Sequence, residues 1–595
     1  MFKKIARFSV RFRWPILILW IAAVPIVTAN FPNINDVTKN NTSDFLPSDS
    51  LTVKGSQLES AFQKKDTATN ALIVVSRTSG KLTPADNAAA TQLVANIRGV
   101  KDVTEVRDSG VSADGQAHEY FVGISGAAFG QGATDIVANI RAAVHKTSLP
   151  VGLRANLTGD LAAEVDQENA NNSGKNKTEL YSVILILVLL LLVFRSILAP
   201  IVTLLPAALA LAISQPVIAE ATKAGVQVGF ITQILLIVLL LGAGTDYGLF
   251  LVFRVREEMR KGLNAKDAVV EALSHVGESI TFSAATVIAA LLSLMLATFG
   301  LYSGLGPALA IGLVIMLLIS LTFLPALLSV LGRAVFWPTK TSKRELSIGL
   351  WGRLADRAIK RPALISVLGV VIFGGLMLGL VGYKDAGFSS SGAPAGSDSA
   401  AGQQVMTKHF PAANSNPQLL IFRFDKSVWV DPSVIARSEQ TLRATGNFSA
   451  ISGPLNANGF NLTPGQLESL RSGNTPATQA ISQFISSDGK TIQFYGILKA
   501  GDTGTTAAMQ SIPAVQADMD KAARQIGASQ ASIYSADTVG YDINHTSNND
   551  LKKIIPVVLL IIAALLAILL RSLVAPWYLI ATVGLSYLAS LGFAM

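Results

Sequence analysis

One carboxyl group in this sequence stands where a carboxylate is costly. Asp246 lies in an apolar stretch that includes Leu239–Leu241, and Tyr247 follows it directly. Arg254, eight residues further on, marks the polar end of the stretch, so a helical rise of about 1.5 Å per residue puts Asp246 about 12 Å inside it. An ionised Asp near a bilayer centre costs roughly 2.5–3.5 kcal/mol. A group kept there is suited to taking up and releasing a proton, and a purely structural polar contact is the alternative.

Hydroxyl groups and glycines surround Asp246 in the predicted helix and its successor. The phenol of Tyr247 could hydrogen-bond a carboxylate on a facing helix, so Asp246 and Tyr247 form the candidate proton relay. Glycines let membrane helices approach closely. The glycines expected to do so are Gly242, Gly244 and Gly248. The candidate relay hydroxyls are Thr245, Ser279 and Ser283. Because Ser and Thr in helices often bond their own backbone, that is the alternative for these three.

The composition indicates a membrane protein around this motif. Hydrophobic residues make up 50% of the 595 residues and charged residues only 15%, against roughly 25% in soluble proteins. The mean hydropathy is +0.46. Runs of about 20 apolar residues can span a bilayer as helices. The predicted spans are 15–32, 178–196, 198–218, 228–252, 278–299, 303–332, 362–381, 551–570 and 573–595.

Two long polar stretches interrupt the apolar runs, and both read as mixed α/β. Their patterns predict the order strand–helix–strand–strand–helix–strand twice, which is the βαββαβ or ferredoxin-like arrangement. The elements of the first stretch are 71–77, 84–97, 102–107, 118–125, 134–145 and 153–158. Those of the second are 418–424, 432–445, 448–452, 491–498, 507–526 and 531–535, with a helical insertion over 459–487.

Short segments recur along the chain and predict an internal duplication. Arg195–Pro200 returns as Arg571–Pro576, and Ser48-Asp49-Ser50 returns as Ser397-Asp398-Ser399. Both copies start from the same side of the membrane, so the repeat is parallel. The first copy holds six spans, whereas the second reaches Met595 within its third. We therefore expect an incomplete second copy and a C-terminally truncated chain, with a natural nine-helix protein as the alternative.

Lysine and arginine set the expected orientation. Basic clusters stand at the head of the chain and after the fourth and sixth spans, so the N-terminus is expected in the cytoplasm and both polar stretches outside. An amphipathic connecting helix is predicted over 255–276. The expected domains are a first span (1–32), a first extracytoplasmic domain (33–175), a five-helix bundle (176–332), a cytoplasmic linker (333–361), a seventh span (362–381), a second extracytoplasmic domain (382–548) and two final spans (549–595).

The sequence lacks the residues and motifs that several classes of function require. The chain has no cysteine, and its five histidines are scattered, so no metal site is expected. No phosphate-binding G-x-x-x-x-G-K-[ST] loop and no G-x-S-x-G elbow occur, which argues against ATP hydrolysis and against an enzyme. The net charge of +9 is spread over helix ends rather than gathered for nucleic acid. We expect no cofactor, with protons as the coupling ion.

The plan of one helix, an outer α/β domain and five helices, begun twice, resembles the RND superfamily. The segment Gly242–Phe250 with Asp246-Tyr247 resembles its MMPL branch, as do Gly277–Ala284 and Asp44–Pro47. This resemblance implies proton-driven export of lipids or other hydrophobic small molecules across a bacterial plasma membrane. It also implies that the outer domains are porter domains. A matching Asp-Tyr pair is implied in a tenth helix, which this sequence does not reach.

Two other functions fit the same features. A non-transporting lipid-binding sensor or scaffold would keep this fold without export, and a protein-export helper like SecDF shares the proton-driven repeat plan. The expected partners are the bilayer and a hydrophobic substrate. The sequence leaves open a homo-oligomer or accessory envelope proteins.

Overall fold

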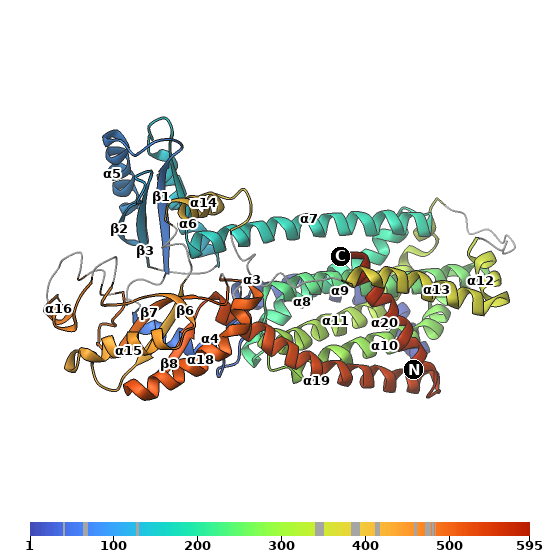
Figure 1. Ribbon diagram of the computed structural model, residues 1–595. Coiled ribbons are helices and arrows are strands. Elements are labelled where there is room, and N and C mark those ends of the chain that lie inside the picture. Colours follow the sequence, from blue (N-terminus) through green and yellow to red (C-terminus); the bar gives the residue numbers. More distant parts are fainter. Residues whose placement is uncertain are drawn as a thin grey trace. The chain divides into compact units, whose positions relative to one another are not determined.

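The computed structural model describes residues 1–39, 42–62, 69–125, 130–338, 350–381, 393–410, 417–456, 461–470, 478, 481, 483–501 and 503–594. The chain divides into two compact units. Unit 1 comprises Met1–Phe45, Thr178–Lys384 and Thr546–Met595. Unit 2 comprises Leu46–Lys177 and Asp385–His545. Figure 1 labels the helices and strands of both.

Unit 1 is a bundle of helices. Its helices are α1 (Phe2–Arg11), α2 (Arg13–Asn30), α3 (Ile34–Val37), α8 (Leu198–Ala221), α9 (Phe230–Arg260), α10 (Ala265–Ser293), α11 (Gly300–Leu331), α12 (Leu350–Lys360), α13 (Pro362–Met377) and α20 (Ala575–Ala594). Two longer helices, α7 (Asp160–Phe194) and α19 (Ala536–Leu570), continue from unit 2 into it. Among the described residues, eight helices are long and apolar enough to cross a membrane. The predicted span 178–196 falls in α7, several of whose side chains lie outside the described residues.

The predicted connecting helix over 255–276 is wrong. Helix α9 continues to Arg260 and α10 begins at Ala265, so the two long helices meet at a tight turn. Gly262 takes a φ of +104°, a conformation that a glycine adopts without strain, and the Asn264 side chain caps α10 by accepting from the Asp267 amide at 3.0 Å. The amphipathic pattern came from the polar ends of two spanning helices.

The repeated Arg-Ser segments form the same turn twice. Arg195 and Arg571 both take a positive φ, 51° and 50°, which is rare for a residue with a side chain. In each turn the following serine then caps the next helix. Ser196 Oγ accepts from the Ala199 amide at 3.4 Å, and Ser572 Oγ accepts from the Ala575 amide at 3.3 Å.

Unit 2 contains two four-stranded antiparallel sheets with the same order of strands. The first, β2-β3-β1-β4, is built from β1 (Thr69–Arg77), α5 (Pro84–Arg98), β2 (Val103–Val111), β3 (Ala117–Ile124), α6 (Gly130–Lys146) and β4 (Leu153–Thr158). The second, β6-β7-β5-β8, is built from β5 (Gln418–Arg423), α15 (Ser433–Ala444), β6 (Phe448–Ser452), α16 (Pro464–Ser469), β7 (Thr491–Leu498), α18 (Thr506–Ile526) and β8 (Gln530–Tyr534). The predicted strands are thus confirmed within a few residues. Helix α16 accounts for part of the predicted insertion, much of which lies outside the described residues.

Each sheet buries one apolar face under its helices. In the first, Ile73 and Val122 of the strands share a core with Leu93 of α5 and Ile140 of α6, and all four are fully buried. In the second, Phe422 and Phe494 pack edge to face within a corresponding core, with ring centroids 6.4 Å apart. Alternating apolar residues in strands and a helical period between them therefore produce these layers.

Two helices that the sequence patterns did not predict are exchanged between the sheets. Helix α4 (Leu51–Glu59) precedes β1 in the chain but packs on β8 and β5, whereas α14 (Asp398–His409) precedes β5 but packs on β4 and β1. Figure 1 shows the blue α4 among the orange elements and the gold α14 beside the blue strands. Each half of the chain therefore completes the sheet of the other half.

The exchanged helices also show that the two Ser-Asp-Ser tripeptides are not equivalent positions. Ser50 caps α4, but Ser397 caps α14, so the last serine of one tripeptide corresponds to the first of the other. In this register Thr52 corresponds to Ser399, the second residue of each helix. Residues 33–45, which the expected first extracytoplasmic domain includes, belong to unit 1 by their contacts. There the Gln233 amide donates to the side chains of Asn35 and Thr38, at 3.1 and 2.7 Å.

Candidate functional site

Helix α9 divides the predicted site residues between two of its faces. Gly242, Asp246 and Phe250, spaced four residues apart, are all exposed along one side of the helix. Gly244, Gly248 and Tyr247 are buried on the other side. Within the described part of the chain, Asp246 makes no hydrogen bond or ion pair. Its carboxyl group is therefore open to a proton donor or to a further polar group.

Two of the three predicted packing glycines lie at close helix contacts. A Cβ placed on Gly244 would come within 2.7 Å of Ala207 in α8 and 2.9 Å of Met316 in α11. A Cβ on Gly248 would come within 2.9 Å of Thr203, again in α8. At Gly242 it would meet no described atom within 4 Å, so the packing role predicted for that glycine stays a prediction.

The structure brings one of the three candidate hydroxyls to the Asp-Tyr pair. Ser283 of α10 forms a side-chain hydrogen bond with Tyr247, whose side chain is buried. Thr245 instead donates to the Leu241 carbonyl at 2.6 Å, the backbone alternative noted above. Ser279 is exposed on α10. The site as described is thus an open carboxyl group, a buried phenol one residue on, and a serine hydroxyl on the next helix.

A second group of charged residues, which the sequence did not indicate, lies in unit 2. Arg141 of α6 donates from both terminal nitrogens to Asp166 of α7, at 2.7 Å each, and from Nε to Asp398 of α14 at 3.1 Å. Asp166 also accepts from the amide and hydroxyl of Ser399. These contacts join α14 to the first sheet, and no sequence signal connects residues more than 200 positions apart.

The described residues contain no set of side chains suited to binding a metal ion. Among them, no group of three or more His, Asp or Glu side chains could hold an ion. The histidines of unit 2 that contact a carboxylate do so in pairs, such as His409 with Asp114 at 2.7 Å and His118 with Asp108 at 2.6 Å. Around Asp246 the described side chains that can exchange a proton are its own carboxyl group, the phenol of Tyr247 and the hydroxyl of Ser283.

Comparison with known proteins gives one family and several relatives. The family model of the MMPL family matches residues 44–365 and 391–595. The chain is 30% identical over 590 residues to the membrane protein ActII-3 of Streptomyces coelicolor, covering 98% of this chain and 76% of that protein. It is 31% identical to the membrane protein SCO0839 of the same organism, covering 98% and 79%. It is 26% identical over 465 residues to the sulfolipid-1 exporter MmpL8 of Mycobacterium tuberculosis, covering 76% of this chain and 42% of that protein.

Proposed function

Because this chain belongs to the MMPL family of membrane proteins, we propose that it exports lipids or other hydrophobic small molecules across the plasma membrane, driven by the proton gradient. A relative whose name states export of a sulfolipid supports a lipid-type substrate. The described helices long enough to cross a membrane supply the path through it. Export would place unit 2 outside the cell, as the lysine and arginine clusters predict.

The proton-coupling part of the proposal rests on the position of Asp246 within a candidate membrane-spanning helix. Its carboxyl group is exposed on α9, away from the buried contacts of Gly244 and Gly248 with α8 and α11. A proton crossing about 100 mV releases about 2.3 kcal/mol, enough to bias a conformational equilibrium roughly fiftyfold. Protonation of Asp246 removes a charge from an apolar helix. It therefore lowers the free-energy cost of placing this face of α9 in an apolar environment. Tyr247 and Ser283 would connect this change to α10.

The proposal assigns the two sheets of unit 2 to substrate handling. We take them as two ferredoxin-like porter domains of a parallel repeat, supported by their shared strand order and the repeated Arg-Ser turns. The exchanged helices α4 and α14 would make these domains respond together. In a lipid-binding scaffold the same fold would bind substrate without moving it.

Transport by the purified chain tests the proposal. Proteoliposomes carrying the chain, a fluorescent phospholipid and an imposed pH gradient should show gradient-dependent lipid transfer to acceptor vesicles. We expect Asp246→Asn to reduce this transfer to the level of protein-free vesicles, because the amide cannot carry the proton, while insertion and thermal stability stay unchanged.

Asp425→Asn is the matched control, since it makes the same change at an exposed position in unit 2. It should transport like the unmodified chain. If Asp246→Asn transports normally at equal membrane levels, the proton role is wrong. If the unmodified chain binds the lipid but never transfers it, the scaffold function replaces export.

A further inference from the structure

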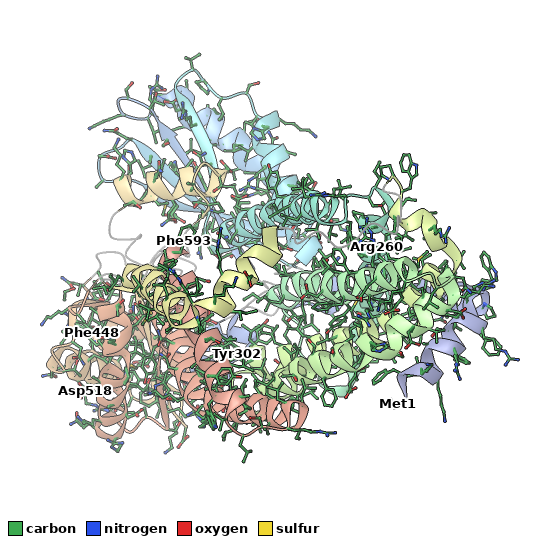
Figure 2. The ribbon with its side chains drawn as sticks, turned by 90° about the vertical axis from the view of Figure 1, so that its right-hand side faces the viewer. Met1, Arg260, Tyr302, Phe448, Asp518 and Phe593 are labelled. Atoms are coloured by element: carbon green, nitrogen blue, oxygen red, sulfur yellow. The ribbon has the colours of Figure 1, made fainter. Side chains whose placement is uncertain are left out.

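The first helix of the chain is held to the bundle by one face only. Ala6, Ser9 and Val10 of α1 are buried against α10 and α11. Ser9 Oγ donates to the Leu321 carbonyl at 3.3 Å, and Lys3 pairs with Glu271 at 3.2 Å. Figure 2 shows α1 leading from Met1 alongside the bundle. These contacts fix how α1 is rotated about its axis, and so they fix what its other faces present.

The remaining surface of α1 and the residue after it carry two adjacent stripes of opposite character. One stripe is aromatic: Phe8 and Phe12 are 55% and 43% exposed, and their ring centroids lie 5.0 Å apart. The other is basic and is formed by the exposed side chains of Lys4, Arg7 and Arg11. Residues three and four apart share a helix face, so each stripe is continuous. In the described structure no acidic side chain pairs with these three cations.

The stripes stand next to a spanning helix. Helix α2 begins at Arg13, directly after Phe12, and its apolar side chains Trp14 and Ile18 are 58% and 64% exposed. Exposed apolar side chains therefore follow one another from Phe8 and Phe12 of α1 into α2, a candidate membrane span. A helix with an apolar stripe beside a basic stripe at the end of a spanning helix suits the boundary between acyl chains and headgroups.

We propose that α1 is a lipid-binding interfacial helix whose Lys4, Arg7 and Arg11 hold anionic phospholipid headgroups while Phe8 and Phe12 enter the acyl boundary. The occupant follows from charge complementarity with the three cations and from the continuity of the aromatic stripe with α2. The inference rests on the membrane location of the chain and does not depend on transport or on the direction of export.

A second helix of the same kind supports this assignment. Helix α12 also directly precedes a spanning helix, α13, which begins at Pro362. Its Arg357 and Lys360 are exposed, and Ile359 is 79% exposed beside them. Unlike the three cations of the basic stripe on α1, Lys360 has an acidic partner, Asp356, at 2.7 Å. The association of a basic amphipathic helix with the start of a span therefore occurs twice in the described chain.

A single cysteine reports the surroundings of the aromatic stripe, because the natural chain has none. Ile5→Cys, labelled with a nitrobenzoxadiazole dye, lies on α1 beside Phe8. The labelled chain is reconstituted in phosphatidylcholine vesicles with and without phosphatidylglycerol. We expect phosphatidylglycerol to lower quenching by aqueous iodide several-fold and to raise quenching by spin-labelled lipid. High salt should reverse both changes, because it screens the headgroup attraction.

Charge removal tests the basic stripe in the same reporter. The triple variant Lys4→Gln, Arg7→Gln, Arg11→Gln should lose the dependence on phosphatidylglycerol. A control with Lys101→Gln, Lys426→Gln and Lys499→Gln removes three exposed charges from unit 2 and should keep it. Equal quenching in both lipids for the unmodified charges, no effect of salt, or a triple variant that still responds would each overturn the proposal. The salt titration needs no variant, so it remains decisive if the triple variant misfolds.

Discussion

Two carboxylates, Asp166 and Asp542, hold the same place in the fold and meet different surroundings. Each is the seventh residue of its long helix, α7 or α19, and each accepts from the amide and hydroxyl of the second residue of an exchanged helix. Thr52 donates to Asp542 at 2.7 Å from its amide and 2.6 Å from its hydroxyl. Of these two carboxylates, Asp166 forms an ion pair with Arg141 at 2.7 Å, and Asp542 does not contact that arginine.

The pKa values of the two carboxyl groups shift in opposite directions. Burial favours the neutral form of Asp166, but the hydrogen bonds from Arg141 and Ser399 and the charge of Arg141 outweigh it and lower the pKa. Burial raises the pKa of Asp542, and the hydrogen bonds from Thr52 only partly oppose it. Asp542 lies before the apolar part of α19, which begins at Leu551.

Neutralising the two groups should therefore have unequal effects. We expect Asp166→Asn to lower the free energy of unfolding at pH 7 by roughly 1.5–3 kcal/mol, because Arg141 loses hydrogen bonds to a charged partner and keeps only Asp398. Asp542→Asn should change it little, since burial already disfavours that charge. Thermal unfolding of the purified chain measures both, and an equal loss in the two variants would contradict the assignment.

Acid should separate the same pair. Asp166, with its lowered folded-state pKa, stabilises the fold above the ordinary value of about 3.9 and loses this contribution as pH falls through the lowered value. The difference between Asp166→Asn and the unmodified chain should therefore shrink in acid. Asp542 acts in the opposite sense: its contribution is present below about pH 3.9 and is lost as pH rises through its raised value.

The sequence predicted Asp246 but neither of these carboxylates, for a physical reason. An acidic residue in an apolar run is anomalous within its own neighbourhood, so a local reading finds it. Asp166 and Asp542 lie in polar segments where acidic residues are ordinary, and their partners are distant: Thr52 and Asp542 are separated by 490 positions. The hydrogen bond between Tyr247 and Ser283 likewise depends on how α9 and α10 face each other, which the sequence does not show.

The exchanged helices α4 and α14 each bring a glycine against a strand. Gly55 and Gly402 are the fifth residues of their helices. A Cβ on Gly55 would lie 2.8 Å from Tyr534 Cβ in β8, and a Cβ on Gly402 would lie 2.7 Å from Thr158 Cβ in β4. Helix and strand thus approach too closely for any larger residue, and the same solution is used in both halves of unit 2.

Alanine at either glycine should destabilise the exchange. We expect Gly55→Ala and Gly402→Ala each to cost roughly 1–3 kcal/mol, because the added methyl group overpacks a contact formed by β carbons. Gly465→Ala in α16 is the control, since no atom lies within 4 Å of its added Cβ, and it should be neutral or slightly stabilising. Protease protection of unit 2 in the full chain reports the loss. A Gly402→Ala chain as stable as the control would show that α14 does not pack on β4 this closely.

Elements with a regular internal pattern were predictable, and their partners were not. The strands over 448–452 and 491–498 match the structure residue for residue, because alternation and turn residues are local signals. The tight turn at Gly262 was not predicted. The polar end of α9 and the polar start of α10 follow each other so closely that together they show the pattern of a single amphipathic helix. The pattern Ser-x-Thr/Ser-x-x-Gly is visible at 50–55 and 397–402, but only the folded chain shows that these helices change places.

Exchange and duplication together make the two halves of the chain depend on each other. Helix α14 from the second half completes the first sheet, and α4 from the first half completes the second. In unit 1, Asp550 of α19 accepts from the amides of Thr298 and Phe299, the two residues before α11, which belongs to the first half. A change in the packing of either exchanged helix therefore affects the sheet of the other half as well.

The expected topology gives a prediction about the whole chain. Both sheets should lie on one side of the membrane and the turn between α9 and α10 on the other. The basic clusters at the head of the chain and after the fourth and sixth predicted spans all fall on the cytoplasmic side in this arrangement. Single cysteines at Lys101, Lys499 and Lys266, all exposed in the structure, place one probe in each region. A membrane-impermeant maleimide should label Lys101→Cys and Lys499→Cys in intact spheroplasts, and Lys266→Cys only after permeabilisation. Labelling of Lys101→Cys and Lys499→Cys from opposite sides would exclude a parallel repeat, because two parallel copies must put corresponding domains on the same face of the bilayer.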